Sequence, residues 1–301
     1  MIPQQRNITR MPIWIRQNLG KETHYRDTSR SVHENALHTV CEEAKCPNRG
    51  ECWSRGTATF MLLGDICTRA CGFCAVKTGK PAWFDQDEPA RVARAVAELK
   101  LSYIVLTSVN RDDLPDGGAG VFAETLRLLR LQNGQIGVEF LTPDFRNCQQ
   151  NAIELMQQTL EALPEGVRRD LVWGHNVETV PRLYREARKG SKYERSLEIL
   201  AAAAKLPGVE SKSALMLGLG ETREEVLAVL QDLRKQGVNR VSLGQYLRPS
   251  LQHLPVQEYL HPDEFAAYEV AAREMGFGWV KAGPMVRSSY FAEEEQLAAL
   301  G

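Results

Sequence analysis

Residues 57–282 alternate between short apolar segments and longer amphipathic ones, and this alternation constrains the fold more than any other feature. Six segments are bounded, apolar and rich in β-branched residues, as buried strands are: 57–63, 102–108, 136–140, 171–173, 214–217 and 241–243. The segments after them carry apolar residues at helical spacing: 89–99, 120–131, 151–163, 191–205, 221–236 and 262–275. Six strand–helix units predict an α/β fold with a parallel sheet and helices outside it.

Three cysteines directly follow the first predicted strand. Cys67, Cys71 and Cys74 form a Cys-x3-Cys-x2-Cys set on one short loop. Three thiolates can hold three irons of a 4Fe-4S cluster, which usually takes four cysteines, so one iron is left open for chemistry. The alternative is a structural zinc site. Such sites normally use four ligands in two close pairs, which this unequal triplet fits poorly.

A second triplet precedes the first. Residues 31–44 carry apolar residues at helical spacing behind a Ser31/Glu34 capping-box pattern, so we expect a helix that delivers Cys41. Cys46 and Cys52 follow on a loop, and this triplet can hold a second 4Fe-4S cluster that again lacks a fourth cysteine. The remaining cysteine, Cys148, is far away in sequence and is interpreted as a packed or idle thiol. The fourth ligand must be another residue type or come from outside the chain.

Composition excludes several classes of function. With a net charge of -1 over 301 residues, the chain has no electrostatic footprint for nucleic acid or an anionic membrane. It has no run of roughly 20 apolar residues that could span a membrane, and residues 1–30 lack the apolar core of a secretory signal. Six of the seven cysteines lie within residues 41–74, which favours metal binding in a reducing cytoplasm; an organellar stroma is the alternative.

Residues 1–30 are polar and basic apart from the apolar stretch 11–15. We interpret them as an extended arm over the main domain with Trp14 as an anchor, or else as a frayed terminus.

The spacing of Cys67, Cys71 and Cys74 resembles that of the radical S-adenosylmethionine (SAM) enzymes. The two triplets in tandem resemble the lipoyl synthases in particular, and the resemblance covers residues 30–292. Further motifs carry it: Thr-Ser-Val-Asn-Arg-Asp-Asp-Leu at 107–114, Asp-Gly-Gly at 116–118, Pro-Asp-Phe at 143–145, His-Asn-Val-Glu at 175–178, Gly-Leu-Gly-Glu-Thr at 218–222, Leu-Gly-Gln-Tyr-Leu at 243–247 and Gly-Pro-Met-Val-Arg-Ser-Ser-Tyr at 283–290.

The resemblance implies a partial (βα)6 TIM-like barrel with its chemistry at the C-terminal ends of the strands. It also implies three parts: an N-terminal arm and auxiliary-cluster extension at 1–55, the radical SAM barrel at 56–282, and a C-terminal segment at 283–301 that closes over the auxiliary cluster.

Site roles follow from the same resemblance. Cys67, Cys71 and Cys74 would bind the SAM cluster, and Cys41, Cys46 and Cys52 the auxiliary cluster. A serine of the 287–290 motif would complete the auxiliary cluster; we favour Ser289, although sequence cannot separate it from Ser288. A hard alkoxide is an ill-matched ligand for thiophilic iron, which suits a cluster that is dismantled in the reaction.

Candidate SAM contacts are Thr107, Asn110, Asp116, Asn176, Glu178 and Gln245. Each region also has a structural interpretation: residues 116–118 can be a turn, 218–220 a close strand–helix contact, and 221–222 a helix N-terminus. Arg111, Asp112, Asp113 and Arg146 can orient SAM or the substrate chain, or can form a salt-bridged rim.

The activity implied is radical insertion of two sulfur atoms, at carbons six and eight of an octanoyl-lysine chain, with the auxiliary cluster as sulfur donor. The implied partners are an octanoylated lipoyl carrier domain or glycine-cleavage H protein, a flavodoxin- or ferredoxin-type electron donor, and an iron–sulfur carrier that rebuilds the cluster. We expect a monomer, because the sequence has no heptad repeat. Residues 146–170, a long connection, leave the preferred carrier open.

Two rival classes remain. Another radical SAM sulfur-inserting enzyme, such as a biotin synthase or methylthiotransferase, would share Cys67–Cys74, but the preceding triplet and the 287–290 motif speak against it. A two-cluster electron carrier is the non-enzymatic alternative. It is disfavoured because electron carriers normally hold fully coordinated clusters in small domains.

Overall fold

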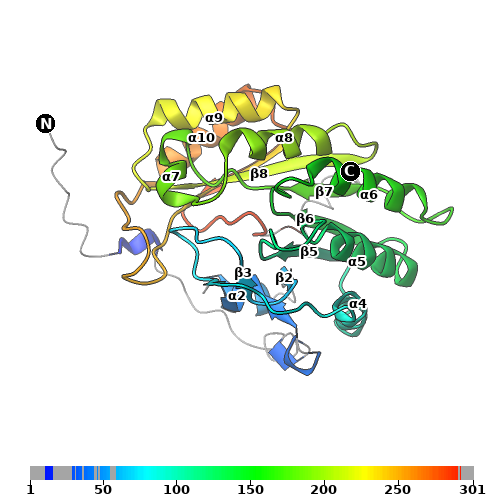
Figure 1. Ribbon diagram of the computed structural model, residues 1–301. Coiled ribbons are helices and arrows are strands. Elements are labelled where there is room, and N and C mark those ends of the chain that lie inside the picture. The colour runs from blue at the N-terminus through cyan, green and yellow to red at the C-terminus, as the bar shows by residue number, and fades with distance from the viewer. Residues whose placement is uncertain are drawn as a thin grey trace, which may run out of the picture.

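The computed structural model describes residues 11–15, 29–30, 32–35, 37–43, 46, 48–54, 59–290 and 292 (Figure 1). Its strands are β1 (His38–Thr39), β2 (Thr59–Leu62), β3 (Ile66–Cys67), β4 (Lys77–Thr78), β5 (Tyr103–Ser108), β6 (Gly137–Leu141), β7 (Leu171–Gly174), β8 (Val209–Leu217), β9 (Arg240–Gln245) and β10 (Trp279–Gly283). Its α-helices are α2 (Val40–Glu43), α3 (Arg49–Ser54), α4 (Glu88–Glu98), α5 (Ala119–Gln132), α6 (Gln149–Glu161), α7 (Tyr184–Ala187), α8 (Tyr193–Ala203), α9 (Arg223–Lys235) and α10 (Pro262–Glu274). Two 3-10 turns are η1 (Ile13–Ile15) and η2 (Pro181–Leu183).

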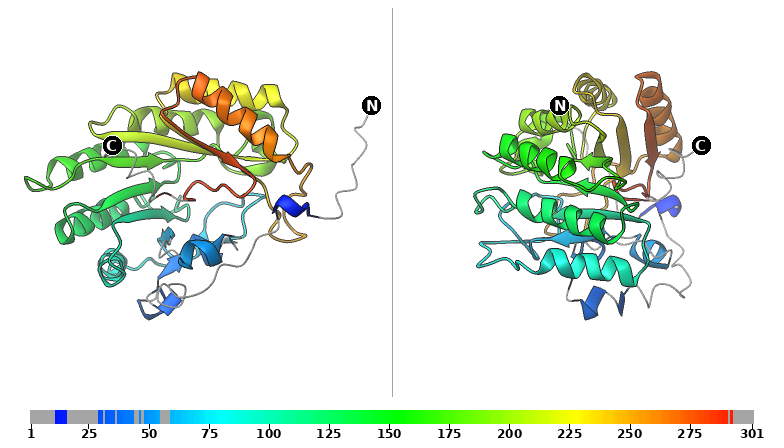
Figure 2. Two further views of the ribbon diagram at one scale, coloured as in Figure 1. Left: turned by 180° about the vertical axis from the view of Figure 1, so that it is seen from behind. Right: turned by 90° about the vertical axis from the view of Figure 1, so that its right-hand side faces the viewer.

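Eight strands form one curved sheet in the order β1-β2-β5-β6-β7-β8-β9-β10. Every neighbouring pair is parallel except β1 with β2. Helices cover the outer face of the sheet, and the segment after β10 runs along the inner side (Figures 1 and 2). The predicted α/β architecture is confirmed: the sheet and its helices form an open barrel.

Alternation along the strands separates an apolar outer layer from a polar interior. Ile104, Phe140 and Trp173 belong to one of the apolar clusters that pack under the helices. The intervening residues face inward, where Tyr103 Oη donates to Glu139 Oε2 at 3.2 Å and Lys212 Nζ donates to the same oxygen at 2.9 Å. The interior of the barrel therefore holds a buried charged network.

All six predicted strands and the six helices after them are present, within a few residues of the predicted bounds. The helices begin where local chemistry favours it. Thr222 and Glu225 form a reciprocal capping box at α9, as do His261 and Glu264 at α10. The sequence did not predict β10, a seventh parallel strand, because its half-buried residues lack an apolar run.

The single helix predicted over 31–44 is wrong. Residues 29–30 and 32–34 are helical, but His38 and Thr39 then pair with Met61 and Phe60 as strand β1. Thr39 Oγ1 accepts a hydrogen bond from Glu42 N at 3.3 Å and so starts the separate helix α2. Pairing with the edge of the sheet outweighs the helical periodicity. Ser31, the expected cap, lies outside the described residues.

Only residues 11–15 and 29–30 of the predicted N-terminal arm are described. The Trp14 ring meets the His261 ring edge to face at 5.1 Å, and Ile15 is buried. These contacts favour the docked interpretation for this stretch.

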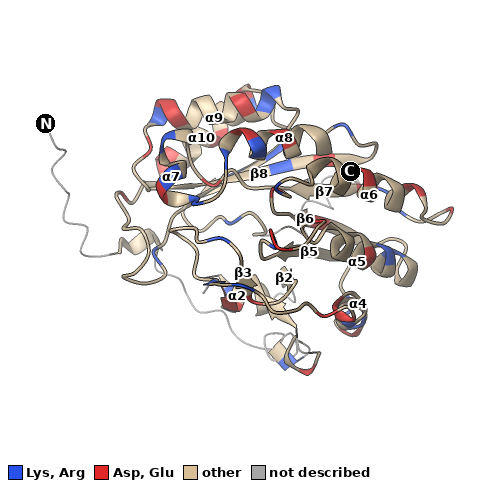
Figure 3. Ribbon diagram, in the orientation of Figure 1, with Lys and Arg blue, Asp and Glu red and all other residues tan. Residues whose placement is uncertain are grey.

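Acidic and basic residues are interspersed along α4 and α9 (Figure 3). Within the described residues, no helix is both long enough and apolar enough to cross a bilayer.

Candidate functional site

The loop that carries Cys67, Cys71 and Cys74 begins at the C-terminal end of β2. Leu63 and Gly64 both have positive φ values, 69° and 84°, and turn the chain away from the sheet. The loop returns on itself, because β3 pairs with β4 and Gly79 N donates to Cys67 O at 2.9 Å. A closed loop of this kind presents its three thiols at the barrel mouth.

The Cys67 end of the loop is tied to the segment after β5. Two main-chain amides donate to the Cys67 sulfur, Asn110 N at 3.3 Å and Arg69 N at 3.5 Å. Thr68 N and Thr68 Oγ1 both donate to Asn110 O at 3.0 Å. The first cysteine is therefore fixed by hydrogen bonds at its sulfur as well as along its backbone.

The Cys71–Cys74 end is tied to the opposite side of the mouth. Gly72 N donates to Ala187 O in α7, and Leu254 N donates to Gly72 O, both at 2.9 Å. His253 Nε2 lies 3.0 Å from Cys74 O. A Cβ at Gly72 would come within 3.0 Å of Glu186 O and Leu254 Cγ, so only glycine fits without displacement here.

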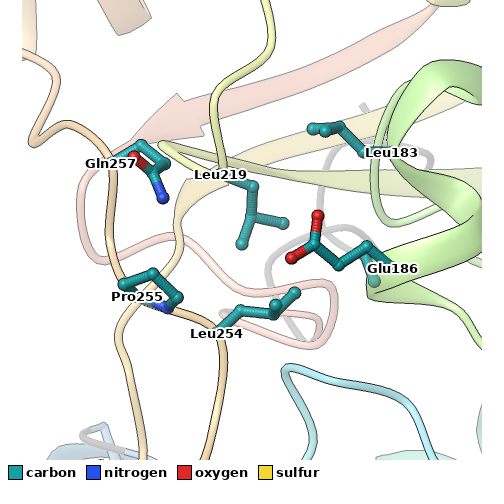
Figure 4. A pocket seen from close by; sticks show the side chains of 7 residues that line it. Leu183, Glu186, Leu219, Leu254, Pro255 and Gln257 are labelled. Atoms are coloured by element: carbon teal, nitrogen blue, oxygen red, sulfur yellow. The ribbon is translucent and has the colours of Figure 1, made fainter. Parts of the chain in front are cut away.

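Behind Gly72 lies a small hollow of about 40 Å³, which Figure 4 shows between Leu183, Leu219 and Leu254 with the Glu186 carboxylate at one side. That volume holds only a few water molecules. The hollow belongs to the packing that supports the loop and is too small for a cofactor.

The thiols of this loop suit an iron–sulfur cluster. Burial raises the pKa of Cys71 to about 11 and that of Cys74 to about 12, so the bare thiols stay protonated and a metal must displace their protons. Among the described residues, no three His, Cys, Asp or Glu side chains converge on a point where one metal ion could bind. Each cysteine of a cuboidal 4Fe-4S cluster binds a different iron, so such a cluster does not need three side chains that converge on one point.

Several predicted SAM contacts do gather beside this loop. Asn110 Oδ1 is buried without a partner among the described residues, so it is an acceptor available to a ligand. Glu178 has a positive φ of 67° and accepts from Asn176 Nδ2 at 3.1 Å. Burial raises the pKa of Glu178, against the lowering effect of the Arg188 charge. A half-buried carboxyl on a strained backbone at a strand end is typical of a functional site.

Three other predicted contacts already bond to the backbone. Thr107 Oγ1 donates to Leu141 O at 2.8 Å. Asp116 accepts from Gly118 N and Gly120 N at the start of α5. Gln245 donates to Leu217 O and Glu258 O and accepts from Leu260 N. Their proposed contact with SAM stays a prediction.

The charged residues after β5 form the salt-bridged rim that the sequence offered as one interpretation. Arg111 pairs with Asp113, and Asp112 pairs with Arg69. Arg146 is exposed. Cys148 is buried, with its sulfur 3.5 Å from Phe145 O, so it is a packed thiol as predicted.

The second triplet lies against the edge of the sheet. Cys41 is in α2, Cys52 is in α3, and Cys46 N donates to Cys41 O at 3.1 Å between them. Burial raises the pKa of Cys41, while a hydrogen bond from the Thr59 main chain lowers it. Cys41 therefore lies beside the first residue of β2.

The C-terminal segment reaches the same place. Thr59 Oγ1 donates to Ser289 Oγ at 3.0 Å, which brings this hydroxyl to the residue that faces Cys41. Asn48 Nδ2 donates to Met285 O at 2.7 Å, and Tyr290 Oη donates to Glu51 Oε2 at 3.1 Å. Three thiols and one serine, from the two ends of the chain, thus meet in one region.

The chain matches the radical SAM superfamily over residues 61–244. It is 48% identical to a lipoyl synthase of Nitrosomonas eutropha over 98% of its length and 91% of the relative's. It is 52% identical to a lipoyl synthase of Methylococcus capsulatus over 97% of its length and 88% of the relative's. The chain belongs to the lipoyl synthase family.

SAM and an iron–sulfur cluster are therefore cofactors of this family member. Two solved structures share its fold. Streptococcus suis SuiB bound to precursor peptide SuiA aligns with a TM-score of 0.55 at 11% identity, over 90% of this chain and 55% of SuiB. Methylornithine synthase (PylB) aligns with a TM-score of 0.53 at 12% identity, over 87% and 83% of the two chains. At such identities the likeness establishes the fold alone.

Sequence reasoning missed the residues that support the loop, among them Arg69, Asp144, Arg188 and His253. Arg69 stands between two predicted ligands and Asp144 lies in the Pro-Asp-Phe motif, and these were the available signals. The others are far from the cysteines in sequence, so only the fold brings them to the loop.

Proposed function

We propose that this lipoyl synthase family member inserts two sulfur atoms, at carbons six and eight, into an octanoyl chain bound to a lysine of a carrier protein. The observation that carries the proposal is the paired arrangement of the cysteine triplets: one on a braced loop at the barrel mouth, the other beside Thr59 and Ser289. One site suits repeated use and the other suits a cluster that is taken apart.

In this proposal Cys67, Cys71 and Cys74 hold a 4Fe-4S cluster with one open iron. When bound, that cluster supplies the electron that cleaves SAM to methionine and a 5′-deoxyadenosyl radical. The chain's own contribution is to bind SAM at this iron and to shield the reaction from water. Asn110 and Glu178 are the side chains that we assign to this task, since Asn110 has an unused buried acceptor and Glu178 is a half-buried carboxyl whose pKa is raised by desolvation.

Cys41, Cys46, Cys52 and Ser289 would hold the second cluster, which supplies the sulfur when bound. A serine oxygen binds iron less well than a thiolate, so this ligand is released more easily than a cysteine. Ser289 rather than Ser288 is assigned because its hydroxyl is the one bonded to Thr59. The 283–290 segment also limits access of water, since it lies across Asn48 and Glu51.

The substrate is an octanoylated lipoyl carrier domain or glycine-cleavage H protein, held by a small and transient contact. An electron donor of the flavodoxin or ferredoxin type and an iron–sulfur carrier protein complete the cycle. We expect a monomer that works in the cytoplasm, a reducing compartment in which its free thiols are stable.

The decisive experiment incubates anaerobically reconstituted protein with SAM, a strong reductant and an octanoyl-lysine peptide, and follows peptide mass over time. The expected product carries two added sulfurs and is preceded by a one-sulfur intermediate. 5′-Deoxyadenosine without peptide thiolation would redirect the substrate to another radical SAM reaction. Neither product, from protein that carries both clusters, would favour the electron carrier.

A further inference from the structure

Arg69 stands inside the loop, two residues after Cys67 and two before Cys71, yet its side chain points away from solvent and is 3% exposed. All three guanidinium nitrogens are engaged. Nε and Nη2 donate to the two Asp112 oxygens at 2.7 and 2.6 Å, Nη2 also donates to Asp144 Oδ1 at 2.6 Å, and Nη1 donates to Ser191 Oγ at 3.2 Å. One side chain thus joins the loop to three barrel elements.

The partners of Arg69 are themselves fixed. Asp144 is fully buried and also accepts from Arg195 Nε at 2.7 Å. Burial alone would raise the pKa of Asp144, but hydrogen bonds from Arg69 and Arg195 and nearby positive charges lower it to about 2. The carboxylate is therefore charged at any working pH, and the anchor does not loosen on mild acidification.

Arg69 and its carboxylate partners are connected to the Cys67 sulfur in two ways. Arg69 supplies one of the amides on that sulfur from its own main chain. Asp112 N donates to Thr68 Oγ1 at 3.1 Å, and Thr68 holds the carbonyl of Asn110, whose amide is the second donor. Movement of the Arg69 side chain relative to Asp112 therefore displaces both N–H groups from the sulfur.

We propose that Arg69 is a positioning residue that holds two N–H···S hydrogen bonds on Cys67 and thereby raises the reduction potential of the cluster on this loop. Reduction adds negative charge to the cluster, and donors aimed at its sulfur ligands stabilise that charge. Loosening the anchor weakens both bonds. The reduced state then becomes harder to reach, and the midpoint potential falls.

The test is a charge-conserving substitution, Arg69→Lys. A lysine keeps the positive charge but cannot reproduce the planar fork that bonds Asp112 and Asp144 together. Anaerobic titrations of the reconstituted protein are followed by electron paramagnetic resonance, and the relevant signal is the one whose line shape changes when SAM is added. The midpoint of Arg69→Lys should lie below that of the parent by more than the scatter between replicate titrations, at equal iron content.

Arg195→Lys is the matched control. It makes the same exchange on the other partner of Asp144, outside the cysteine loop, so its midpoint should equal the parent's. An Arg69→Lys midpoint equal to the parent's would overturn the inference. An equal fall in Arg195→Lys would also overturn it, because the effect would then come from the rim in general.

A second pair of variants, at Thr68, changes no charged residue. It tests the hydrogen bonds on Cys67 if the Arg69→Lys protein does not bind a cluster. Thr68→Val removes the hydroxyl between Asn110 and Asp112 at nearly constant shape and should lower the midpoint, whereas Thr68→Ser should restore it. Equal midpoints for the two Thr68 variants would count against the inference.

This inference rests on the proposed assignment of Cys67, Cys71 and Cys74 to the SAM cluster. Different results would contradict the proposed function and the role of Arg69. If the parent protein has no cluster that responds to SAM, the proposed function is wrong. If such a cluster is present but its midpoint potential is unchanged in the variants, only the role of Arg69 is wrong.

Discussion

The two cysteine regions are built in opposite ways. The loop at Cys67–Cys74 is bonded to segments on both sides of the barrel mouth, through Asn110, Ala187 and Leu254. The region at Cys41–Cys52 consists of two short helices against the edge strand, and among the described residues it is joined to the C-terminal segment by side-chain hydrogen bonds that include those of Asn48 and Glu51. The first site is built from one loop and its barrel neighbours, whereas the second joins residues that are 237 and 239 positions apart in sequence.

Under the proposed function, this difference shows how one chain could keep one cluster and give up another. A thiol loop that is bonded on both sides suits a cluster that must survive each turnover. A region that is closed by a separate terminal segment can open locally at a lower free-energy cost than global unfolding. If this division holds, mutations in the two regions should have different effects.

The largest loss of activity should come from removing one cysteine of either triplet, and the two losses should differ in kind. Cys71→Ala should abolish 5′-deoxyadenosine formation, because the loop can no longer hold its cluster. Cys46→Ala should retain 5′-deoxyadenosine formation and abolish sulfur insertion. Chromatography of the nucleoside and mass spectrometry of the peptide report the two outcomes, and loss of both products in Cys46→Ala would show that the sites are not independent.

Acidification should lower the free energy of unfolding through His175, a buried residue of the barrel. His175 lies with Nδ1 2.8 Å from Thr142 O and Nε2 3.0 Å from Ser196 Oγ, and burial, aided by the Arg188 charge, lowers its pKa to about 4. In the unfolded chain the imidazole of His175 is protonated below about pH 6.5. In the folded chain it is protonated only below about pH 4. The free energy of unfolding should therefore fall by about 3 kcal/mol as the pH drops across this interval.

Urea unfolding of the parent and of His175→Asn at pH 7 and pH 5 measures this effect. The parent should lose more stability than the variant on acidification. A variant as acid-sensitive as the parent would assign the loss to other groups.

At the second site, sulfur insertion should depend on Ser289 more than on Ser288. Ser289→Ala should lower sulfur insertion at least about tenfold, because loss of a ligand or its support typically costs one to two orders of magnitude. Ser288→Ala should have a much smaller effect. Turnover of the octanoyl peptide measures both, and the reverse order would transfer the assignment to Ser288.

The smallest effect should come from single hydroxyl groups. Tyr290→Phe removes the bond to Glu51 and should destabilise closure by about 1 kcal/mol, so amide hydrogen exchange should rise in residues 48–54. Tyr246→Phe is its counterpart on the barrel side, because it removes a bond of 2.8 Å to Leu254 O. Exchange should then rise around Leu254 instead. Identical exchange maps for the two variants would contradict the division.

Much of the barrel could be predicted because periodicity reports burial directly. Each predicted strand has one face under the helices, and residues such as Phe140 and Leu243 mark it. The edge could not be predicted in the same way. His38 and Thr39 become a strand only because Met61 and Phe60 offer unpaired backbone groups, which is a property of the sheet and not of the local sequence.

The ligand cysteines could be proposed because residue type and spacing alone indicate a metal-binding chemistry. Part of their support could not, because backbone groups make it and the sequence restricts those groups very little. Ala187 and Leu254 hold Gly72 through a carbonyl and an amide N–H; any residue could supply the carbonyl, and any residue except proline the N–H. Gln245, a predicted SAM contact, also bonds to the backbone of neighbouring segments, which the sequence did not indicate; its contact with SAM stays a prediction.

The bonds from Thr59 to Ser289 and from Glu51 to Tyr290 also set an order of events during synthesis. These partners are 230 and 239 residues apart in the sequence, so the ribosome makes the whole sheet before they can meet. The partners of the Cys67–Cys74 loop, such as Asn110 and Ala187, are made earlier than Ser289 and Tyr290. The region around Cys41 can therefore close only after the barrel strands have been synthesised.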